Sequence, residues 1–481
     1  MSHLAASSPF HFHVPPAATG LPPSPPLQLL PPLRVGLLGL GTVGAGTLAV
    51  LRRNQALIER RTGRRIVITH VAARNLARAA ALAGPDVAVL ASAHDVATHP
   101  DVDVVVEAVG GTTAALDWVL AALASGKHVV TANKALLAEC GQQVFAAAQA
   151  HGRVVAFEGA VAVSIPIIKA LREGLGANRI EWLAGIINGT SNFILSAMHG
   201  KGLSFDAALA QAQQLGYAEA DPAFDVDGVD AAHKLTLLAA VAFGMPLRFD
   251  AVQVQGIRAL QAADMACAQA LGYRIKLLGV ARRVPTPQGE AVTLSVQPTL
   301  IPATHMLANV DGALNGIVVQ GDACGPTLHG GAGAGGEQTG SAVVADLMDI
   351  ARLDAHAHAR QADTRPHPAA VVPLLGMHPW AVEDLPVLPA DQVVSPHYLR
   401  VPVHGNHHAA LSEVARCLAA QGVPLLSIFK GPSSLAAPCL VALTQPTPAH
   451  TVQASLAAIQ ALPMVSGAVV SLRVETLDAQ A

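Results

Sequence analysis

The sequence predicts an α/β protein made of three folded units, and three observations lead to this prediction. Short apolar strands alternate with helical segments from Leu33 onward, which is typical of a parallel sheet covered by helices. A glycine-rich loop joins the first strand to the first helix. After residue 160 the chain changes to an α+β pattern, and it ends in the order β-α-β-β-α-β.

Composition limits the classes of protein to which the chain can belong. Its 481 residues suggest about three domains, since one domain averages roughly 150 residues. The net charge of -3 gives no basic surface for nucleic acid, and no apolar run reaches the roughly 18 residues that a membrane helix requires. Five cysteines without a Cys-x-x-Cys pair predict neither disulfides nor a zinc site, a pattern typical of a cytoplasmic protein.

Residues 1–32 are predicted to form a disordered tail. This stretch is rich in Pro and carries His3, His11 and His13. It lacks the positive segment and apolar core of a secretory signal. Since no Asp, Glu or Cys accompanies these histidines, solvated side chains are a better interpretation than a metal site.

The first folded unit, residues 33–160, begins with a strand at residues 33–38 that leads into a Gly-x-Gly-x-x-Gly loop. Such a loop is weak evidence alone, but its place between a strand and a helix predicts a Rossmann-type dinucleotide fold. The glycines let the backbone approach a pyrophosphate, which then lies on the amides of the helix N-terminus. The candidate cofactor ligands of this loop are Gly39, Gly41, Thr42, Val43 and Gly44.

The second strand, residues 66–73, ends at Arg74. An NAD-specific site usually has Asp or Glu here to hold the ribose 2′-hydroxyl, whereas Arg suits a 2′-phosphate. NADP is therefore the expected cofactor, and NAD stays possible. Arg74 lies farther from the glycine loop than usual, so a solvated arginine is the alternative. The segment from Asn54 to Arg65 is expected to be a helix end and a loop.

Further strands are expected at residues 103–108, 128–131 and 154–157, and the loops after the first two carry Gly110, Gly111 and Lys134. Ligands of an open α/β sheet bind at the carboxyl ends of its strands. Lys134 is therefore a candidate for contacting phosphate or polarising a carbonyl group, with a surface lysine at a helix start as the equal alternative.

The second unit, residues 161–330, is predicted to be an α+β domain. The polar turn from Asn188 to Asn192 is expected to cap a helix beginning at Phe193 through its Thr or Ser. After the glycine-rich segment 331–336 comes a predicted helix at residues 340–352. Abundant glycine before a helix can cradle an anion, although a flexible linker is the simpler interpretation.

The stretch from Leu215 to Lys234 concentrates carboxylates in a chain with only 13% charged residues. Asp230 and Lys234 are four residues apart at the start of a helix, so they share one face. A surface salt bridge is the ordinary interpretation, but the sequence that continues this helix is too apolar for a helix on the surface. A lysine beside carboxylates at the mouth of a buried helix can transfer protons.

These motifs, in this order and spacing, resemble homoserine dehydrogenase. The similarity runs from about Leu33 to Leu353 and rests most on the Asn-Gly-Thr-x-Asn turn and the Gly-x-Asp-x-x-x-Lys segment ending at Lys234. It implies reversible hydride transfer between NAD(P)H and L-aspartate 4-semialdehyde, which gives L-homoserine for threonine, methionine and isoleucine biosynthesis. It also implies that residues 331–353 complete the nucleotide-binding domain and that residues 161–330 form the catalytic and dimerisation domain.

The resemblance also assigns roles to individual residues. It implies that Lys234 donates the proton to the carbonyl oxygen, and that Lys134 lies between nicotinamide and substrate. It further implies substrate binding by Glu219, Asp225 and Asp230, and cofactor binding by Lys134, Gly216 and Gly335. A cation that can release a proton stabilises a developing alkoxide, which agrees with these roles.

A monovalent cation, Na⁺ or K⁺, is implied near Glu158, Val161, Val163 and Ile165, mostly through backbone oxygens. Hard cations prefer oxygen ligands. The family usually has Gly-Gly where this chain has Val163 and Ser164, and a position that requires positive φ would strain a valine. The cation site is therefore in question.

Residues 354–396 are predicted to be a linker with some ordered pieces, and residues 397–478 a ferredoxin-like unit. This unit resembles an ACT domain, but the segment from His404 to His408 replaces the usual Asp-x-Pro-Gly effector loop. A structural or dimerising role is therefore expected, with threonine feedback in doubt. The resemblance implies a homodimer or homotetramer. A different Rossmann reductase of an amino-acid aldehyde, and a catalytically impaired NADP-binding regulatory subunit, stay as alternatives.

Overall fold

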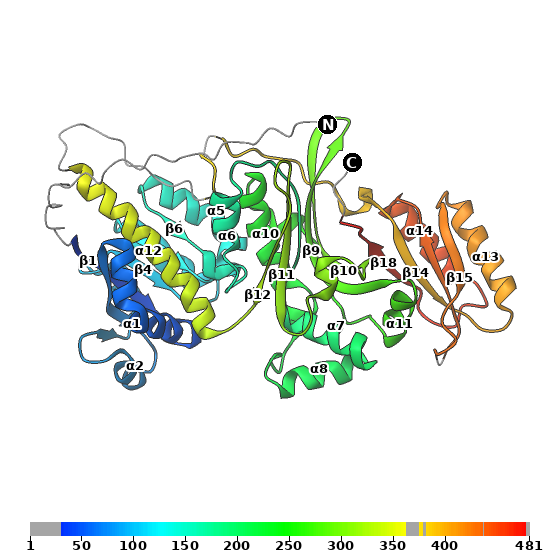
Figure 1. The fold of residues 1–481 in the computed structure, drawn as a ribbon, viewed down its shortest axis with the longest axis horizontal. Helices are drawn as coiled ribbons and strands as arrows, with labels where there is room; N and C mark the ends of the chain where they lie inside the picture. The colour runs from blue at the N-terminus through cyan, green and yellow to red at the C-terminus, as the bar shows by residue number, and fades with distance from the viewer. Residues whose placement is uncertain (1–29, 362–374, 379–380, 436, 478–481) are drawn as a thin grey trace, which may run out of the picture.

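A computed structural model describes residues 30–361, 375–378, 381–435 and 437–477. Figure 1 shows an elongated molecule with one sheet at one end, a longer sheet in the middle and a small α+β unit at the other end. Residues 1–29 of the predicted tail lie outside the described residues. Strand β1 begins at Leu30, so the last part of the predicted 1–32 tail belongs to the first strand.

The first sheet has six parallel strands in the order β3-β2-β1-β4-β5-β6. This is the doubly wound order, in which ligands bind beyond the carboxyl ends of the strands. The predicted parallel α/β fold is thus confirmed. Strand β3 was not predicted, because three residues are too few to show the alternation of apolar and polar side chains that marks a strand. The strands are β1 (Leu30–Leu38), β2 (Arg64–Ala72), β3 (Ala88–Leu90), β4 (Val104–Glu107), β5 (His128–Thr131) and β6 (Val155–Ala156).

Helices cover this sheet, and two of them come from distant parts of the chain and pack together. A Cβ atom on Gly46 of α1 would lie only 2.0 Å from the carbonyl oxygen of Gly336, the first residue of α12. The returning helix α12 buries Val343 and Leu347 against the first sheet. The helices here are α1 (Thr42–Thr62), α2 (Leu76–Ala83), α3 (Ala93–Thr98), α4 (Thr113–Ala124), α5 (Lys134–Ala150) and α12 (Gly336–Gln361).

Several helix ends differ from the sequence prediction, including the start of α12, which is Gly336 rather than residue 340. Helix α1 continues to Thr62 through the predicted loop and ends at Gly63, whose φ of 68° favours glycine. Helix α12 continues to Gln361, so the predicted domain boundary at residue 353 falls inside a helix. Helix α7 begins at Gly189 rather than Phe193, because the side chain of Asn188, not Thr or Ser, caps it.

The central part of the second sheet follows the order β12-β11-β7-β9-β10. Helix α10 contacts β9, β10 and α5. Every residue of α10 from Asp230 to Phe243 is therefore buried, in agreement with its apolar sequence. The strands are β7 (Ile180–Ile186), β8 (Gln253–Val254), β9 (Tyr273–Thr286), β10 (Gly289–Pro302), β11 (Leu314–Gly321) and β12 (Gly325–Ala332). The helices are α6 (Ile167–Lys169), α7 (Gly189–Lys201), α8 (Phe205–Gln214), α9 (Ala223–Val226), α10 (Val229–Phe243) and α11 (Ala262–Ala270).

The C-terminal unit continues the same sheet in the order β18-β14-β16-β15. Strand β10 pairs with β18 in parallel, with Thr299 opposite Arg473. A bridge between Val292 and Val387 also ties the predicted linker to this sheet. The predicted β-α-β-β-α-β order is present. The elements are β13 (Val394–Ser395), β14 (His397–Pro402), α13 (His407–Ala420), β15 (Leu425–Lys430), β16 (Cys439–Thr444), β17 (Thr447–Pro448), α14 (Ala449–Gln460) and β18 (Val470–Val474).

Candidate active site

A cavity of about 780 Å³ lies between the carboxyl edge of the first sheet and the second sheet's helices, and we call it the central cavity. It gathers most of the site residues predicted from the sequence. Those that line it are Thr42, Val43, Lys134, Val161, Val163, Gly216, Asp225, Asp230, Lys234 and Gly335. Residues that the sequence analysis did not single out as ligands also line it, among them Asn188, Thr190, Tyr217 and Asp311.

Lys234 extends from the second turn of α10 and is 7% exposed. Its Nζ atom lies 2.8 Å from Asp230 Oδ2 and donates a hydrogen bond of 2.8 Å to the carbonyl oxygen of Ile187. The predicted i,i+4 pair therefore exists, but it is buried rather than solvated. Since an ammonium group has three donors, these two partners leave one proton for a ligand in the central cavity.

Lys134 approaches the same carboxylate from the first residue of α5. Its Nζ atom lies 3.1 Å from Asp230 Oδ1 and 5.6 Å from the centre of the Phe224 ring. Burial alone would raise the pKa of Asp230, but the ammonium groups of Lys234 and Lys134 outweigh it and lower this pKa to about 2. One ionised carboxylate thus holds two lysines at the wall of the cavity.

Asn188 organises the acidic side of this cluster. Its Nδ2 atom donates to Asp225 Oδ1 at 2.7 Å and to Asp230 Oδ2 at 2.8 Å, while its Oδ1 accepts from the amide of Ser191. Burial raises the pKa of Asp225, and the hydrogen bond from Asn188 opposes that change. From sequence, this turn was a helix cap and part of the family resemblance, and Asn188 was given no role toward the acids, because nothing local reveals contacts 37 and 42 residues away.

Glu219 is the predicted substrate ligand that the structure does not bring to this cluster. The residue is exposed and does not line the central cavity. Its carbonyl oxygen accepts a hydrogen bond from Gln213 Nε2. The neighbouring Gly216, in contrast, lines the cavity and has a φ of 75°.

The glycine loop has the geometry that a pyrophosphate requires. Gly39 has a φ of 91°, and a Cβ on Gly44 would lie 2.1 Å from the carbonyl oxygen of Gly39. Space above Gly41 is open, since a Cβ there would contact nothing within 4 Å. No side chain caps α1, so its first amides stay available to an anion. The N-terminus of α12 adjoins Thr42 at the same place.

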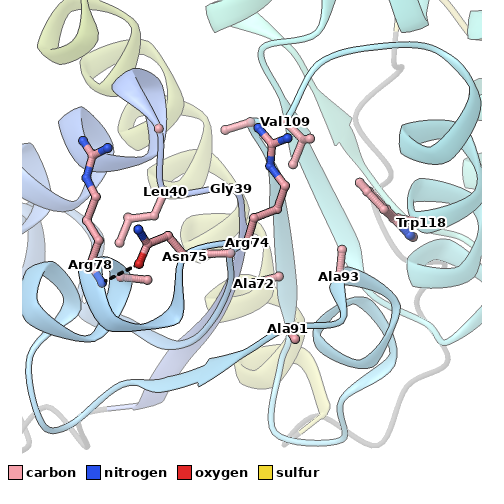
Figure 2. A pocket seen from close by; sticks show the side chains of 14 residues that line it. Gly39, Leu40, Ala72, Arg74, Asn75, Arg78, Ala91, Ala93, Val109 and Trp118 are labelled. Carbon is pink, nitrogen blue, oxygen red and sulfur yellow. Dashed lines mark hydrogen bonds between the residues drawn. The ribbon is translucent and has the colours of Figure 1, made fainter.

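A second cavity of about 460 Å³ lies beyond the end of β2, and we call it the adenosine cavity (Figure 2). Gly39, Gly41 and Arg74 line it, as does Arg78 of α2, which the sequence analysis did not identify. In Figure 2 the side chain of Arg74 extends from the turn after β2 and that of Arg78 from helix α2, and both point the same way in this view. The predicted cofactor residues therefore divide between these two cavities, except Gly44, which lines neither.

The segment expected to hold a cation contains an unusual backbone conformation. Val163 has a φ of 55°, a left-handed conformation that is rare for a β-branched residue. Glu158 is buried and accepts from the amides of Ile168 and Lys169, each at 3.0 Å. Ile165 is buried as well. Within the described residues, no group of three or more His, Cys, Asp or Glu side chains suits a metal ion.

A doubly wound sheet whose carboxyl edge faces buried Asp230 and Lys234 and the partly exposed Lys134 is typical of an oxidoreductase that uses a nicotinamide dinucleotide. Two family models match the chain. The model "Homoserine dehydrogenase" matches residues 166–348, and "Homoserine dehydrogenase, NAD binding domain" matches residues 39–158. The chain belongs to the homoserine dehydrogenase family.

Individual relatives agree with this assignment over nearly the whole chain. The homoserine dehydrogenase of Pseudomonas aeruginosa is 49% identical over 93% of this chain and 100% of its own length. That of Neisseria gonorrhoeae is 47% identical over 93% of this chain and 99% of its own length. The crystal structure of a homoserine dehydrogenase from Thiobacillus denitrificans superposes with a TM-score of 0.84 at 50% identity, covering 93% of this chain and 99% of that one.

Proposed function

We propose that this protein catalyses the reversible NAD(P)H-dependent reduction of L-aspartate 4-semialdehyde to L-homoserine, a step in the biosynthesis of threonine, methionine and isoleucine. One observation carries the proposal: Asp230 holds both Lys234 and Lys134 at the wall of the cavity that the glycine loop also borders. A nicotinamide cofactor bound along the glycine loop supplies the hydride that the aldehyde carbon accepts.

Lys234 is the proposed proton donor to the aldehyde oxygen. Asp230 and the carbonyl of Ile187 fix its ammonium group, so that the remaining N–H can point at the oxygen that gains negative charge. Lys134 adds a second positive charge nearby. Positively charged groups held in place before the reaction stabilise a developing alkoxide more than mobile solvent does.

The substrate's ammonium group is proposed to lie beside Asp225. Both oxygens of Asp230 already have partners, since Oδ1 contacts Lys134 and Oδ2 contacts Lys234 and Asn188. Asp225 accepts from Asn188 through Oδ1 and also has a hydrogen bond with the Thr190 side chain. Since a carboxylate has about four lone-pair sites, it can still accept from an ammonium group. Asp230 acts here mainly by placing the two lysines, and the exposed Glu219 is proposed as an outer ligand at the entrance.

Cofactor, cation, assembly and location complete the proposal. Arg74 at the end of β2 supports a preference for NADP over NAD.

A monovalent cation is proposed on the backbone oxygens of Glu158, Val161, Val163 and Ile165. The protein is also proposed to form a homodimer or homotetramer and to act in the cytoplasm. Strand β12, at the end of the second sheet, presents Leu328 with 43% exposure and supports a partner there.

The C-terminal unit is proposed to be an ACT-like domain with a structural role. Its pairing through β10 and β18 supports this role, as does the bridge of 2.6 Å between Arg400 and Asp264. The altered segment from His404 to His408 gives no support to threonine binding.

The test is to follow NADPH oxidation with L-aspartate 4-semialdehyde and to identify the product. Turnover with formation of L-homoserine is expected. Binding of NADPH without oxidation would contradict the proposal and favour an NADP-binding regulatory subunit. Faster turnover of a different amino-acid aldehyde would favour another Rossmann reductase.

A further inference from the structure

The adenosine cavity contains two positive side chains and no carboxylate among the 14 residues that line it. The cations are Arg74, which follows β2, and Arg78, in the first turn of α2. Both side chains are exposed, and neither makes a hydrogen bond or ion pair with another described residue. Two unpaired guanidinium groups in one cavity form an electropositive site for a phosphate dianion.

Helix α2 holds Arg78 from a fixed backbone. Asn75 accepts a hydrogen bond of 3.0 Å from the amide of Arg78 at the start of the helix. At the other end, Arg52 of α1 donates to the carbonyl oxygens of Leu82, at 2.8 Å, and Ala83. Helix α2, which carries Arg78, is therefore held at both ends, while the guanidinium group makes no hydrogen bond or ion pair with the described residues. A fixed backbone lowers the entropic cost of ordering this side chain when a ligand binds.

The neighbouring groups indicate which ligand is bound. A sheet of this kind places the adenosine ribose beyond the end of β2, where NAD-specific proteins carry an acid for the 2′-hydroxyl. Here the carboxamide oxygen of Asn75 is used as the helix cap, and the cavity lining offers no acid to a diol. A ribose without phosphate would leave two guanidinium groups unpaired, whereas a 2′-phosphate has enough oxygens for both.

We propose that Arg78 is a second ligand of the cofactor's 2′-phosphate and that Arg74 and Arg78 together determine the preference for NADP. This inference rests on the proposed function and extends it to a residue that decides cofactor specificity. In this proposal Arg78 approaches the phosphate from helix α2 and Arg74 from the end of β2.

The first test compares kcat/KM for NADPH and for NADH in Arg78→Ala, Arg74→Ala and the double variant. Loss of one charge-assisted contact should lower the NADPH value about tenfold or more and change the NADH value less than about twofold. The double variant should lose most of the discrimination, and Arg78→Lys should restore part of it. Arg60→Ala, an exposed arginine of α1 outside both cavities, is the matched control.

A second test does not depend on turnover. Isothermal calorimetry on the intact chain would compare adenosine 2′,5′-bisphosphate with adenosine 5′-phosphate. Arg78→Ala should weaken only the bisphosphate, and a loss that is equal for both ligands, or no loss, would overturn the proposal. If the wild type discriminates between these ligands but reduces no aldehyde, the proposed reaction fails while the role of Arg78 stands.

Discussion

Two buried carboxylates, Asp230 and Asp264, bind cations in different ways. Asp264 is fully buried and its carboxylate faces Arg400, with Nε at 2.6 Å and Nη2 at 3.2 Å. Asp264 Oδ2 also accepts from the backbone amide of Gln261. The side-chain oxygen of Gln261 accepts from Arg400 Nη2. One negative and one positive charge are thus balanced, and Nε and Nη2 of Arg400 both donate within the pair, Nη2 also to Gln261. Such a closed pair joins α11 to β14 and presents nothing to a ligand.

Asp230 is almost as buried but carries two positive partners, Lys234 and Lys134. Asp225, linked to Asp230 through Asn188, adds a second carboxylate, so two lysines and two acids meet at the wall of the central cavity. Because all four side chains border the cavity, their charges can act on a ligand there, whereas the Asp264 pair borders none of the cavities described above. Both carboxylates are buried, so burial alone does not distinguish them. The number of charged partners and the access of those partners to a cavity distinguish a site that can carry out chemistry from a structural contact.

The largest effect is expected from Lys234→Ala. Removal of the proposed proton donor should lower kcat by roughly 10²- to 10⁴-fold, because the second lysine still holds Asp230 ionised but cannot take over the proton. Steady-state NADPH oxidation checks this. Lys430→Ala, at an exposed lysine of β15, should keep the wild-type rate. A Lys234→Ala variant with near-normal kcat would show that the proton comes from another group.

Asp264→Ala should affect stability instead. It leaves the guanidinium group of Arg400 buried without its charge partner, which should cost about 3 to 5 kcal/mol, while kcat of the folded fraction stays near that of the wild type. Urea denaturation followed beside activity measures both quantities. Replacing the pair together, by Asp264→Leu with Arg400→Met, should recover much of the loss. If Asp264→Ala instead abolishes kcat in a fully folded protein, the pair is not merely structural.

The acid limb of stability should depend on Asp230. Its pKa is about 2 in the folded protein, below the unfolded value of about 3.9. A depressed pKa stabilises the fold at pH values above the unfolded pKa, and this contribution of about 2.6 kcal/mol is lost as the pH falls from about 4 to 2. Denaturation midpoints measured across this range should show a shallower acid limb in Asp230→Asn. The exposed control Asp86→Asn should retain the wild-type slope.

Local sequence was enough to predict those parts of the site whose geometry is local. The strand-glycine-helix order predicted the nucleotide loop, and the spacing of Asp230 and Lys234 predicted a pair on one helix face, because both depend on neighbours in the chain. Asn188 as the organiser of two distant carboxylates was missed, and so was Arg78 as a lining residue. Pairing of β10 with β18 joins segments that are far apart in sequence, and no periodicity reports such a contact.

The conformation of Val163 gives the smallest and most local prediction. A β-branched residue at φ 55° costs about 1 to 2 kcal/mol relative to glycine in the same conformation, while glycine adds about 0.5 to 1 kcal/mol of unfolded-state entropy. Val163→Gly should therefore raise the free energy of unfolding by up to about 1 kcal/mol. Val161→Gly, at a φ of -108°, should lower it, because only the entropic cost and the lost packing act there.

Measuring both variants in K⁺ and in a large organic cation separates strain from ion binding. If the backbone oxygens around Val163 hold a monovalent ion, K⁺ should stabilise the wild type, and Val163→Gly should increase that effect by relaxing the ring of ligands. A Val163→Gly variant no more stable than the wild type in either salt would mean that the surrounding packing, rather than the residue itself, imposes the left-handed backbone. Unlike the two buried carboxylates, whose roles follow from their partners, this residue would then owe its conformation to the fold alone.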